Sequence, residues 1–183
     1  MSRLLLVRHC ESSGQHADAP LTARGLAQAE ALAETLAAFP IERIVSSPYL
    51  RARQTIAPYA ARVGLGVELD PRLEERKLSR EPIPDWREHV RASFHDLERR
   101  APGGESGRET LERGRAALAD VLARGAKLSA IVGHGQHLSL LLHAIDGRFG
   151  FAGWEALTNP DLYLVETDAR GVLRYARAWE GPP

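Results

Sequence analysis

The sequence predicts a single three-layer α/β domain in which a mostly parallel β-sheet is flanked by helices. Short apolar runs alternate along the chain with longer segments whose apolar residues recur at helical spacing, a pattern typical of β-α-β units. The runs Leu4–Val7 and Leu128–Val132 are continuous, as expected for strands buried on both faces. A chain of 183 residues is also long enough to form one compact core.

Four further segments are predicted strands. Residues 43–46 and 67–69 are short runs that fit a parallel sheet. Residues 161–166 and 172–179 alternate apolar and polar side chains, and Asp168-Ala169-Arg170-Gly171 joins them. This last pair predicts a terminal hairpin.

Capping residues mark the first two helices. Thr22 can cap a helix whose apolar side chains recur at helical spacing. These side chains are Leu26, Ala29, Leu32, Ala33 and Leu36. Ser47 followed by Pro48 predicts the start of a second helix, which Pro58 should kink or end.

The second half of the chain contains an insertion and two more helices. Pro82–Arg100 is a polar, Arg-rich helical stretch, and we expect residues 80–105 to form a lid over the site. Ser106 and Glu109 form a capping box for a helix that runs to about Arg124. An apolar helix follows Gly133-His134-Gly135 and ends near residue 147.

Composition restricts the partners and the location. Lys+Arg and Asp+Glu each number 24, so the chain lacks the basic excess of a nucleic-acid-binding protein. The one cysteine, Cys10, cannot form a disulfide within the chain. The apolar run near the start is too short for a signal peptide or a membrane span. We expect a cytoplasmic protein with no nucleic-acid or membrane partner; no oligomeric state is predicted.

Basic and imidazole side chains follow three predicted strands. Arg8 and His9 follow the first strand, Arg51 comes soon after the second, and His134 follows the strand at 128–132. Ligands of open α/β sheets bind at the carboxyl ends of the strands, so we expect these side chains to meet at one edge. Helix N-termini at that edge favour an anion, and four such side chains need a compensating negative charge. A phosphate ion or a small phosphorylated substrate is the predicted ligand.

These residue types suit phosphoryl transfer. A neutral imidazole can attack phosphorus, and the arginines with the second imidazole can stabilise the charge on the equatorial oxygens. The leaving oxygen needs a proton from a carboxylic acid, and Glu74 and Glu75 both lie just past the third strand. The chemistry alone does not choose between them. The scheme requires no metal and no cofactor.

At these residues the sequence resembles the histidine phosphatase superfamily, which contains the cofactor-dependent phosphoglycerate mutases. The similar blocks follow in the family's order and cover most of the chain. They are Leu6–Ser12, Pro20–Thr22 with Gly25 and Gln28-Ala29, Ser46–Ala52 with Gln54-Thr55, Leu73–Arg76, Gly103–Ser106 and Val132–Gly135. The resemblance implies a mostly parallel sheet flanked by helices and a phosphohistidine intermediate.

The resemblance also implies roles for the site residues. His9 would be the nucleophile and Glu75 the proton donor, while Arg8, Arg51 and His134 would bind phosphate. Two more phosphate-binding residues are expected. These are Gln15, where the family often has asparagine, and Gly135, which follows the second histidine.

The sequence departs from the family at two positions. Cys10 stands where the family usually has glycine, and Ser79 stands where a glycine is expected after the acid segment. His9-Cys10 is also similar to the start of the cysteine-phosphatase pattern, but His16 occupies the position of its arginine. We therefore expect Cys10 to be a partly buried, inert thiol.

Other polar residues have competing interpretations. His134, His137 and His143 could suggest a metal, but no cysteine or carboxylate completes a tetrahedral set, so His137 and His143 are expected to make ordinary hydrogen bonds. A group of basic residues could be a solvated face or bind substrate. This group is Arg76, Lys77, Arg80 and Arg87. The substrate-selecting walls are expected to come from Trp86, His89, Arg80 and Arg87.

The first functional hypothesis is a phosphatase that hydrolyses phosphate monoesters, either of small molecules or of phosphohistidine. The alternatives are a phosphoglycerate mutase-type transferase and a non-catalytic phosphate-binding protein. A mutase must exclude water from its phosphoenzyme, and only Pro82–Arg100 could serve as a lid here, which favours hydrolysis.

Overall fold

The computed structural model describes residues 3–167, 170 and 172–181 and contains one six-stranded sheet in the order β3-β2-β4-β1-β5-β6. The strands are β1 (Arg3–Arg8), β2 (Arg43–Ser46), β3 (Val67–Leu69), β4 (Leu128–Gly133), β5 (Asp161–Thr167) and β6 (Leu173–Arg177). Strands β3, β2, β4 and β1 pair in parallel. The predicted single α/β domain with a mostly parallel sheet is confirmed.

An antiparallel hairpin completes the sheet at one edge. Strand β5 pairs antiparallel with β1, and β6 pairs antiparallel with β5, as predicted for the terminal hairpin. Residues 168, 169 and 171 of the expected connection lie outside the described residues.

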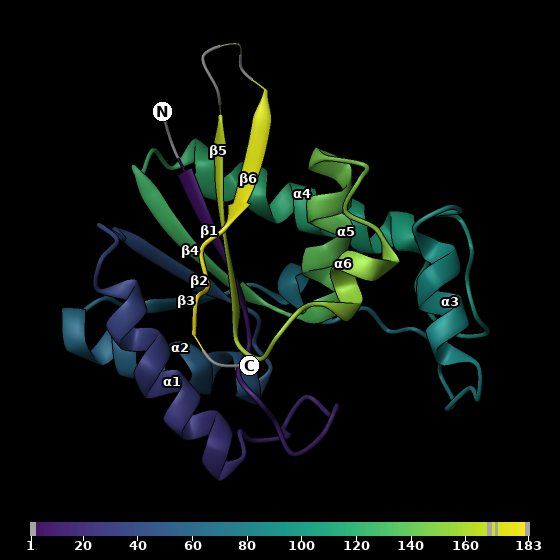
Figure 1. Cartoon of the computed structure of the whole chain (residues 1–183), viewed down its shortest axis with the longest axis horizontal. Coiled ribbons are helices and arrows are strands. Elements are labelled where there is room, and N and C mark those ends of the chain that lie inside the picture. The colour runs from purple at the N-terminus through teal and green to yellow at the C-terminus, as the bar shows by residue number, and fades with distance from the viewer. Residues whose placement is uncertain (1–2, 168–169, 171, 182–183) are drawn as a thin grey trace.

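The alternation of side chains along β1 builds a core on each face of the sheet. Leu5 and Val7 pack into one cluster with apolar residues of α1 (Ala23–Leu36) and α2 (Leu50–Val63). Leu6 packs into a second cluster with residues of α4 (Gly107–Ala123) and α5 (Gly135–Ile145). Figure 1 shows the resulting layers, with α1 and α2 on one side of the sheet and α4 and α5 on the other.

Helix α1 has the predicted N-cap, but one residue of its predicted buried face is exposed. The Thr22 side chain accepts a hydrogen bond from the Gly25 backbone N–H, which satisfies one amide of the first turn. Leu26, predicted to be apolar and inward, is 51% exposed. The buried stripe includes Gly25 instead, because that face packs tightly against the loop from Glu11 to Leu21.

Helix α2 begins later than predicted and passes through its proline. It starts at Leu50, and its N-cap is Tyr49 rather than Ser47. Pro58 lies inside the helix, which continues to Val63. Ile56, Tyr59 and Ala60 are buried in the core on either side of the proline, and this packing outweighs the lost backbone hydrogen bond.

The second half of the chain matches its helix signals closely. The capping box of Ser106 and Glu109 is present at the start of α4, and Arg124 is the C-cap. Helix α5 ends at Ile145, two residues before Gly147. Two short helices carried no sequence prediction: η1 (Pro71–Leu73) and α6 (Phe151–Glu155).

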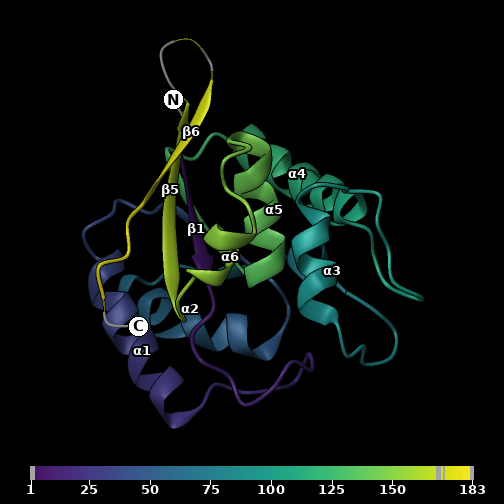
Figure 2. The ribbon, with the colours of Figure 1, turned by 45° about the vertical axis from the view of Figure 1, so that its right-hand side comes forward.

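The insertion is helical over only part of its predicted length. Helix α3 spans Trp86–Ser93 instead of Pro82–Arg100. Val90 of α3 and its C-cap residue Phe94 form a small third core with Leu140 of α5 and Phe151 of α6. Figure 2 shows α3 beside α5 and α6, on the side away from the sheet.

Within the described residues, no helix is long and apolar enough to cross a membrane.

Gly25 generates a stability prediction, because a Cβ at this position would lie 2.0 Å from the Glu11 carbonyl oxygen. The neighbour is backbone, so the helix and loop would have to separate. We expect Gly25→Ala to lower the free energy of unfolding by about 1–3 kcal/mol, measured by denaturant titration, although alanine is the better helix former.

Gly66→Ala is the matched control, since a Cβ there meets nothing within 4 Å. It should leave the free energy of unfolding unchanged or raise it by up to about 1 kcal/mol. Equal effects of the two substitutions would contradict the close contact between Gly25 and Glu11.

Candidate active site

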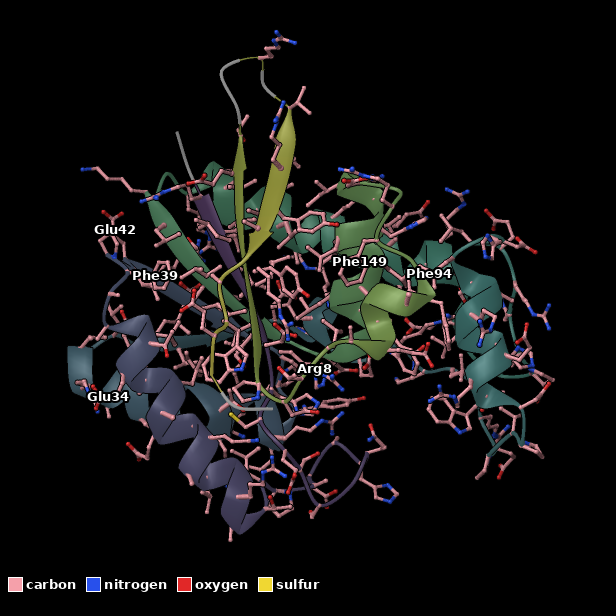
Figure 3. The ribbon with its side chains drawn as sticks, in the orientation of Figure 1. Arg8, Glu34, Phe39, Glu42, Phe94 and Phe149 are labelled. Carbon is pink, nitrogen blue, oxygen red and sulfur yellow. The ribbon has the colours of Figure 1, made fainter. Side chains whose placement is uncertain are left out.

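The carboxyl ends of β1, β2 and β4 bring three chain segments together. The His9 backbone N–H donates to the Gly133 carbonyl (3.0 Å), and the Ser47 N–H donates to the Val132 carbonyl (2.9 Å). These bonds extend the ladders one residue past the strands, so His9, Ser47 and His134 leave the sheet side by side. Figure 3 shows Arg8 at this edge.

The four side chains predicted to converge lie together. The His9 and His134 ring centroids are 5.2 Å apart. Arg51 Nε donates to His9 Nε2 at 3.2 Å. A Cβ on Gly135, the residue after His134, would lie 3.3 Å from the Arg8 guanidinium. Glycine at position 135 therefore allows the Arg8 side chain to lie against the start of α5.

His9 is held in one tautomer by the backbone carbonyl of the next residue. Its Nδ1 lies 2.6 Å from the Cys10 carbonyl oxygen, and since a carbonyl only accepts, Nδ1 carries the proton. The lone pair is then on Nε2, where it accepts the bond from Arg51. Burial, with the nearby Arg51 and Arg8 charges, lowers the His9 pKa to about 3 against the opposing effect of the Cys10 bond. The ring is a neutral imidazole at physiological pH.

His134 is positioned by Ser47. The Ser47 hydroxyl accepts from the Tyr49 N–H (3.3 Å) and lies 2.8 Å from His134 Nε2. We assign the hydroxyl as the donor to this nitrogen. The proton of the ring is then on Nδ1. Burial, followed by the repulsion that a protonated His9 would exert, holds the His134 pKa well below its usual value. Both imidazoles of the site are therefore neutral.

The two arginines are fixed by carbonyl oxygens, not by carboxylates. Arg8 Nη1 donates to the Leu157 carbonyl (3.0 Å), and Arg51 Nη1 donates to the His16 carbonyl (2.8 Å). Burial lowers the pKa of both arginines, and the charge of Glu75 opposes this effect. Carbonyl partners position a guanidinium without neutralising it, so both positive charges remain available to a ligand.

Three buried nitrogens of this cluster have no hydrogen-bond partner among the described residues. They are Arg8 Nε, Arg51 Nη2 and His134 Nδ1. Buried donors left unpaired cost free energy, and native proteins contain few of them. Three donors in one cluster, two of them on cations, suit an anion with several acceptor oxygens.

A cavity of about 510 Å³ adjoins the cluster. Four of the predicted site residues line it: Arg8, Gln15, Glu75 and Gly135. His9, Arg51 and His134 are buried beside these residues and do not line the cavity. Gln15 lies between the two groups, since its carbonyl accepts from Arg51 Nη1 (3.2 Å).

The structure distinguishes Glu75 from Glu74 by position. Glu75 lines the cavity, and its carboxylate accepts from the backbone N–H of Arg76 (2.8 Å), His137 (3.0 Å) and Gln136 (3.1 Å). Two of these amides belong to the first turn of α5. Glu74 is not among the lining residues, and its Oε2 lies 4.0 Å from Lys77 Nζ.

The Cys10 thiol lies in the core beneath α1 and α2, fully buried rather than partly buried as predicted. Burial raises the pKa of the thiol to about 12, while the Thr55 hydroxyl acts in the opposite direction. A neutral thiol is a poor nucleophile, which removes the cysteine-phosphatase interpretation. The side chain does not line the cavity, so it does not crowd the ligand.

The histidines of α5 differ from each other. His143 Nδ1 makes the expected ordinary hydrogen bond, to the Phe149 carbonyl (2.8 Å). The same prediction is wrong for His137, which is fully buried with neither ring nitrogen paired among the described residues. Gly114 of α4 leaves room for this ring, since a Cβ there would lie 2.4 Å from His137 Nε2. The part of the chain that the structure describes contains no group of three or more side chains suited to a metal ion.

Neither interpretation of Arg76, solvated face or substrate binding, describes its contacts. The side chain is buried, and its guanidinium donates to the Ser93 hydroxyl (2.5 Å) and the Glu105 carbonyl (3.1 Å). Burial lowers the pKa of Arg76. The arginine lines the cavity but is committed to holding α3 against the start of α4.

The predicted cavity walls are partly wrong. Of Trp86, His89, Arg80 and Arg87, only Trp86 lines the cavity. Lys77, Leu78 and Ser79 of the preceding segment line it as well, together with Trp154 of α6. The prediction failed because α3 is shorter than expected and a helix from another part of the chain supplies the facing wall.

Three contributors to the site were not predicted. Ser47 is predicted to follow the second strand and to cap a helix, but no role at the site is assigned to it from the sequence. Tyr49 lines the cavity, with its ring centroid 5.0 Å from that of His134. Asn159 donates from Nδ2 to the His9 carbonyl (2.6 Å) and arrives from the loop before the antiparallel β5, where no motif marked it.

Comparison with known proteins gives consistent matches. The sequence profile of the histidine phosphatase superfamily (branch 1) matches residues 4–176. The probable phosphoglycerate mutase GpmB of Enterobacter sp. (strain 638) is 34% identical over 172 residues, covering 83% of this chain and 78% of that protein.

Solved structures are also similar to this chain in fold. Mycobacterial glucosyl-3-phosphoglycerate phosphatase in its native form has a TM-score of 0.78 and 26% identity, with 96% of each chain covered. Its complex with inorganic phosphate has a TM-score of 0.76 and 26% identity, covering 97% of this chain and 95% of that one.

The buried histidines generate a prediction for the pH dependence of stability. Burial lowers the pKa of His9 and of His137 to about 3, whereas an unfolded imidazole titrates near 6.5. Between these values the unfolded state binds more protons, so the free energy of unfolding should fall as the pH falls from 6.5 toward 3. Denaturant titrations at several pH values measure the slope.

His137→Gln should make this slope shallower, since it removes one of the buried histidines, which are His9, His134 and His137. His95→Gln, at an exposed histidine, is the control and should keep the slope of the unmodified protein. A His137→Gln variant with an unaltered slope would show that His137 is not held neutral in the folded state.

Proposed function

The chain belongs to the histidine phosphatase superfamily, and from that premise we propose that it hydrolyses phosphate monoesters through a phosphohistidine at His9. The observation that carries the proposal is the cluster of three unpaired nitrogens, Arg8 Nε, Arg51 Nη2 and His134 Nδ1, around a neutral imidazole. Small phosphorylated molecules and phosphohistidine are the substrate classes considered.

The first step is attack by His9 Nε2 on phosphorus. The Nδ1–H bond to the Cys10 carbonyl keeps the lone pair on Nε2 and stabilises the positive charge that develops on the ring. As the substrate enters, Arg51 Nε gives up its hydrogen bond to His9 Nε2 and donates to a phosphoryl oxygen instead. An N–P bond forms, and the bond from phosphorus to the ester oxygen breaks.

The phosphoryl oxygens are bound by the cluster described above. Arg8, Arg51 and His134 supply charged and neutral donors, Gly135 permits close approach at the N-terminus of α5, and Gln15 lies at the edge. Charge in the transition state is spread over these oxygens, so fixed donors stabilise it without reorganisation.

The leaving oxygen takes its proton from Glu75. This carboxyl lines the cavity, and Oε2 accepts only one of the three backbone bonds, which leaves a lone pair for a proton. In the second step the same carboxylate takes a proton from water, which attacks the phosphohistidine and releases phosphate. Glu74, outside the cavity lining, remains the alternative donor.

Hydrolysis is favoured over a mutase reaction by the rim of the cavity. Residues 80–105, proposed as a lid, contribute Trp86, which is 41% exposed; the neighbouring Lys77 side chain is 67% exposed. Water therefore reaches this end of the cavity, which a mutase phosphoenzyme must avoid. The mutase remains the second candidate because the GpmB relatives are named probable phosphoglycerate mutases. Turnover of glycerol 3-phosphate without added bisphosphoglycerate separates the two activities.

His9→Ala tests the nucleophile. Hydrolysis should fall by at least about 10³-fold, since the covalent route is lost. Labelled phosphate should no longer remain on the protein after a rapid quench in base. Inorganic phosphate should still bind, because the arginines and His134 are unchanged.

His95→Ala serves as the control, because that histidine is exposed and outside the cavity lining. Full hydrolysis by His9→Ala would refute the phosphohistidine mechanism. A wild-type protein that turns over no phosphorylated compound would refute the enzyme proposal and favour a phosphate-binding protein.

Glu75→Gln tests the proton donor. It should lower kcat by about 10²–10⁴-fold for alkyl phosphates, whose alkoxides need a proton to leave. The loss should be smaller for p-nitrophenyl phosphate, whose leaving group is a weak base. Glu74→Gln is the paired comparison, and a larger leaving-group dependence in that variant would transfer the role to Glu74.

A further inference from the structure

Two tryptophans from separate parts of the chain form one wall of the cavity. Trp86 opens α3, and Trp154 lies in α6. Their ring centroids are 5.9 Å apart with planes at 80°. Arg8 and Gly135, proposed above to bind the phosphoryl group, line the same cavity. A substrate held at His9 therefore has its leaving group within reach of this indole wall.

The wall is held in place by contacts between α3 and α6. Arg87 of α3 forms an ion pair with Glu155 of α6. Its guanidinium carbon lies 5.8 Å from the Trp86 ring centroid and 5.9 Å from that of Trp154. The Trp154 ring also contacts Phe151 at 5.3 Å. These contacts fix the rings before a ligand arrives, which reduces the entropy lost on binding.

The polar side chains beside the indole wall differ in whether they are free to bind a ligand. Gln136 lines the cavity, and its Oε1 is buried with no hydrogen-bond partner among the described residues, which leaves this oxygen as an acceptor for a ligand group that reaches it. Lys77 Nζ already lies 4.0 Å from Glu74 Oε2, and Arg76 is committed to Ser93 and Glu105. The two cations that line the cavity away from the phosphate cluster, Arg76 and Lys77, thus have partners, which disfavours a leaving group with its own carboxylate.

We propose that the leaving alcohol of the substrate carries a ring with a flat apolar face, which packs against Trp86 and Trp154. A hydroxyl or N–H group on that alcohol donates to Gln136 Oε1. The inference rests on the proposed phosphatase activity, because the phosphoryl end must lie at His9. Indole faces bind aromatic rings and the C–H faces of sugars, so a nucleoside and a sugar share the required chemistry.

The test compares phosphate esters of primary alcohols, so that the leaving oxygen is similar throughout. Three carry a ring: 2-phenylethyl phosphate, adenosine 5′-monophosphate and glucose 6-phosphate. Two do not: glycerol 3-phosphate and 3-phosphoglycerate. In the unmodified protein, kcat/KM for at least one ring-bearing ester should exceed that for both ringless esters by about tenfold. The ring-bearing ester with the highest kcat/KM shows whether the preferred leaving group contains an aromatic ring or a sugar.

Substitutions in the wall connect this preference to the two tryptophans. Trp86→Ala and Trp154→Ala should reduce the ring-to-ringless ratio of kcat/KM by about tenfold, through an increase of KM for the ring-bearing esters. Trp86→Phe should retain most of the preference. Gln136→Leu should raise KM for adenosine 5′-monophosphate and glucose 6-phosphate more than for 2-phenylethyl phosphate, which has no donor.

Leu173→Ala is the matched control, because Leu173 is 42% exposed, as Trp86 is 41% exposed, and it does not line the cavity. Hydrolysis of every ester with no preference for rings, or a preference unchanged in Trp86→Ala, overturns this inference and leaves the phosphatase proposal standing. Hydrolysis of none of the esters overturns both.

Discussion

The arrangement at the carboxyl ends of β1 and β4 depends on burying two imidazoles beside two guanidinium groups without accumulating four charges. The structure achieves this by keeping His9 and His134 neutral, since burial lowers the pKa of both rings. Only the two arginines then remain charged. Each imidazole has one nitrogen fixed by a neighbour, a backbone carbonyl for His9 and a serine hydroxyl for His134. The nucleophilic lone pair and the free donor both follow from these two bonds.

Much of the sequence around the site serves to hold this arrangement rather than to react. The Glu11 side chain accepts from the Thr22 hydroxyl (2.7 Å), and its backbone N–H donates to Gln28 (2.9 Å). Gly25 lets the helix approach the same segment. These contacts close the loop between His9 and α1, whose carbonyls at Gln15 and His16 fix Arg51. Glu11, Thr22, Gly25 and Gln28 belong to the family-like blocks of the sequence, and their contacts give them a structural role.

The sequence was sufficient where the determining physics is local. Continuous apolar runs predicted the parallel strands, and the caps at Thr22 and Ser106 marked two helix starts. The convergence of basic residues followed from strand ends alone. The misses depend on tertiary packing. Ser47 could cap a helix or bind a histidine, and only the position of His134 decides. The His137 ring packs against Gly114 of α4, and neither of its nitrogens has a hydrogen-bond partner among the described residues. The spacing of histidines along the chain does not predict this packing.

The phosphate cluster and the indole wall lie on different parts of the fold. The residues proposed to react are therefore separate from those proposed to select the leaving group. The cluster lies at the ends of β1 and β4 and in the first turn of α2, which follows β2. The registers of these strands are fixed by buried side chains on both faces of the sheet, so the geometry of the cluster tolerates little change. The wall sits on α3 and α6, which pack outside the sheet through a small third core and an exposed ion pair. Substitutions there can alter the leaving group that is accepted without moving His9, because no strand of the sheet has to shift.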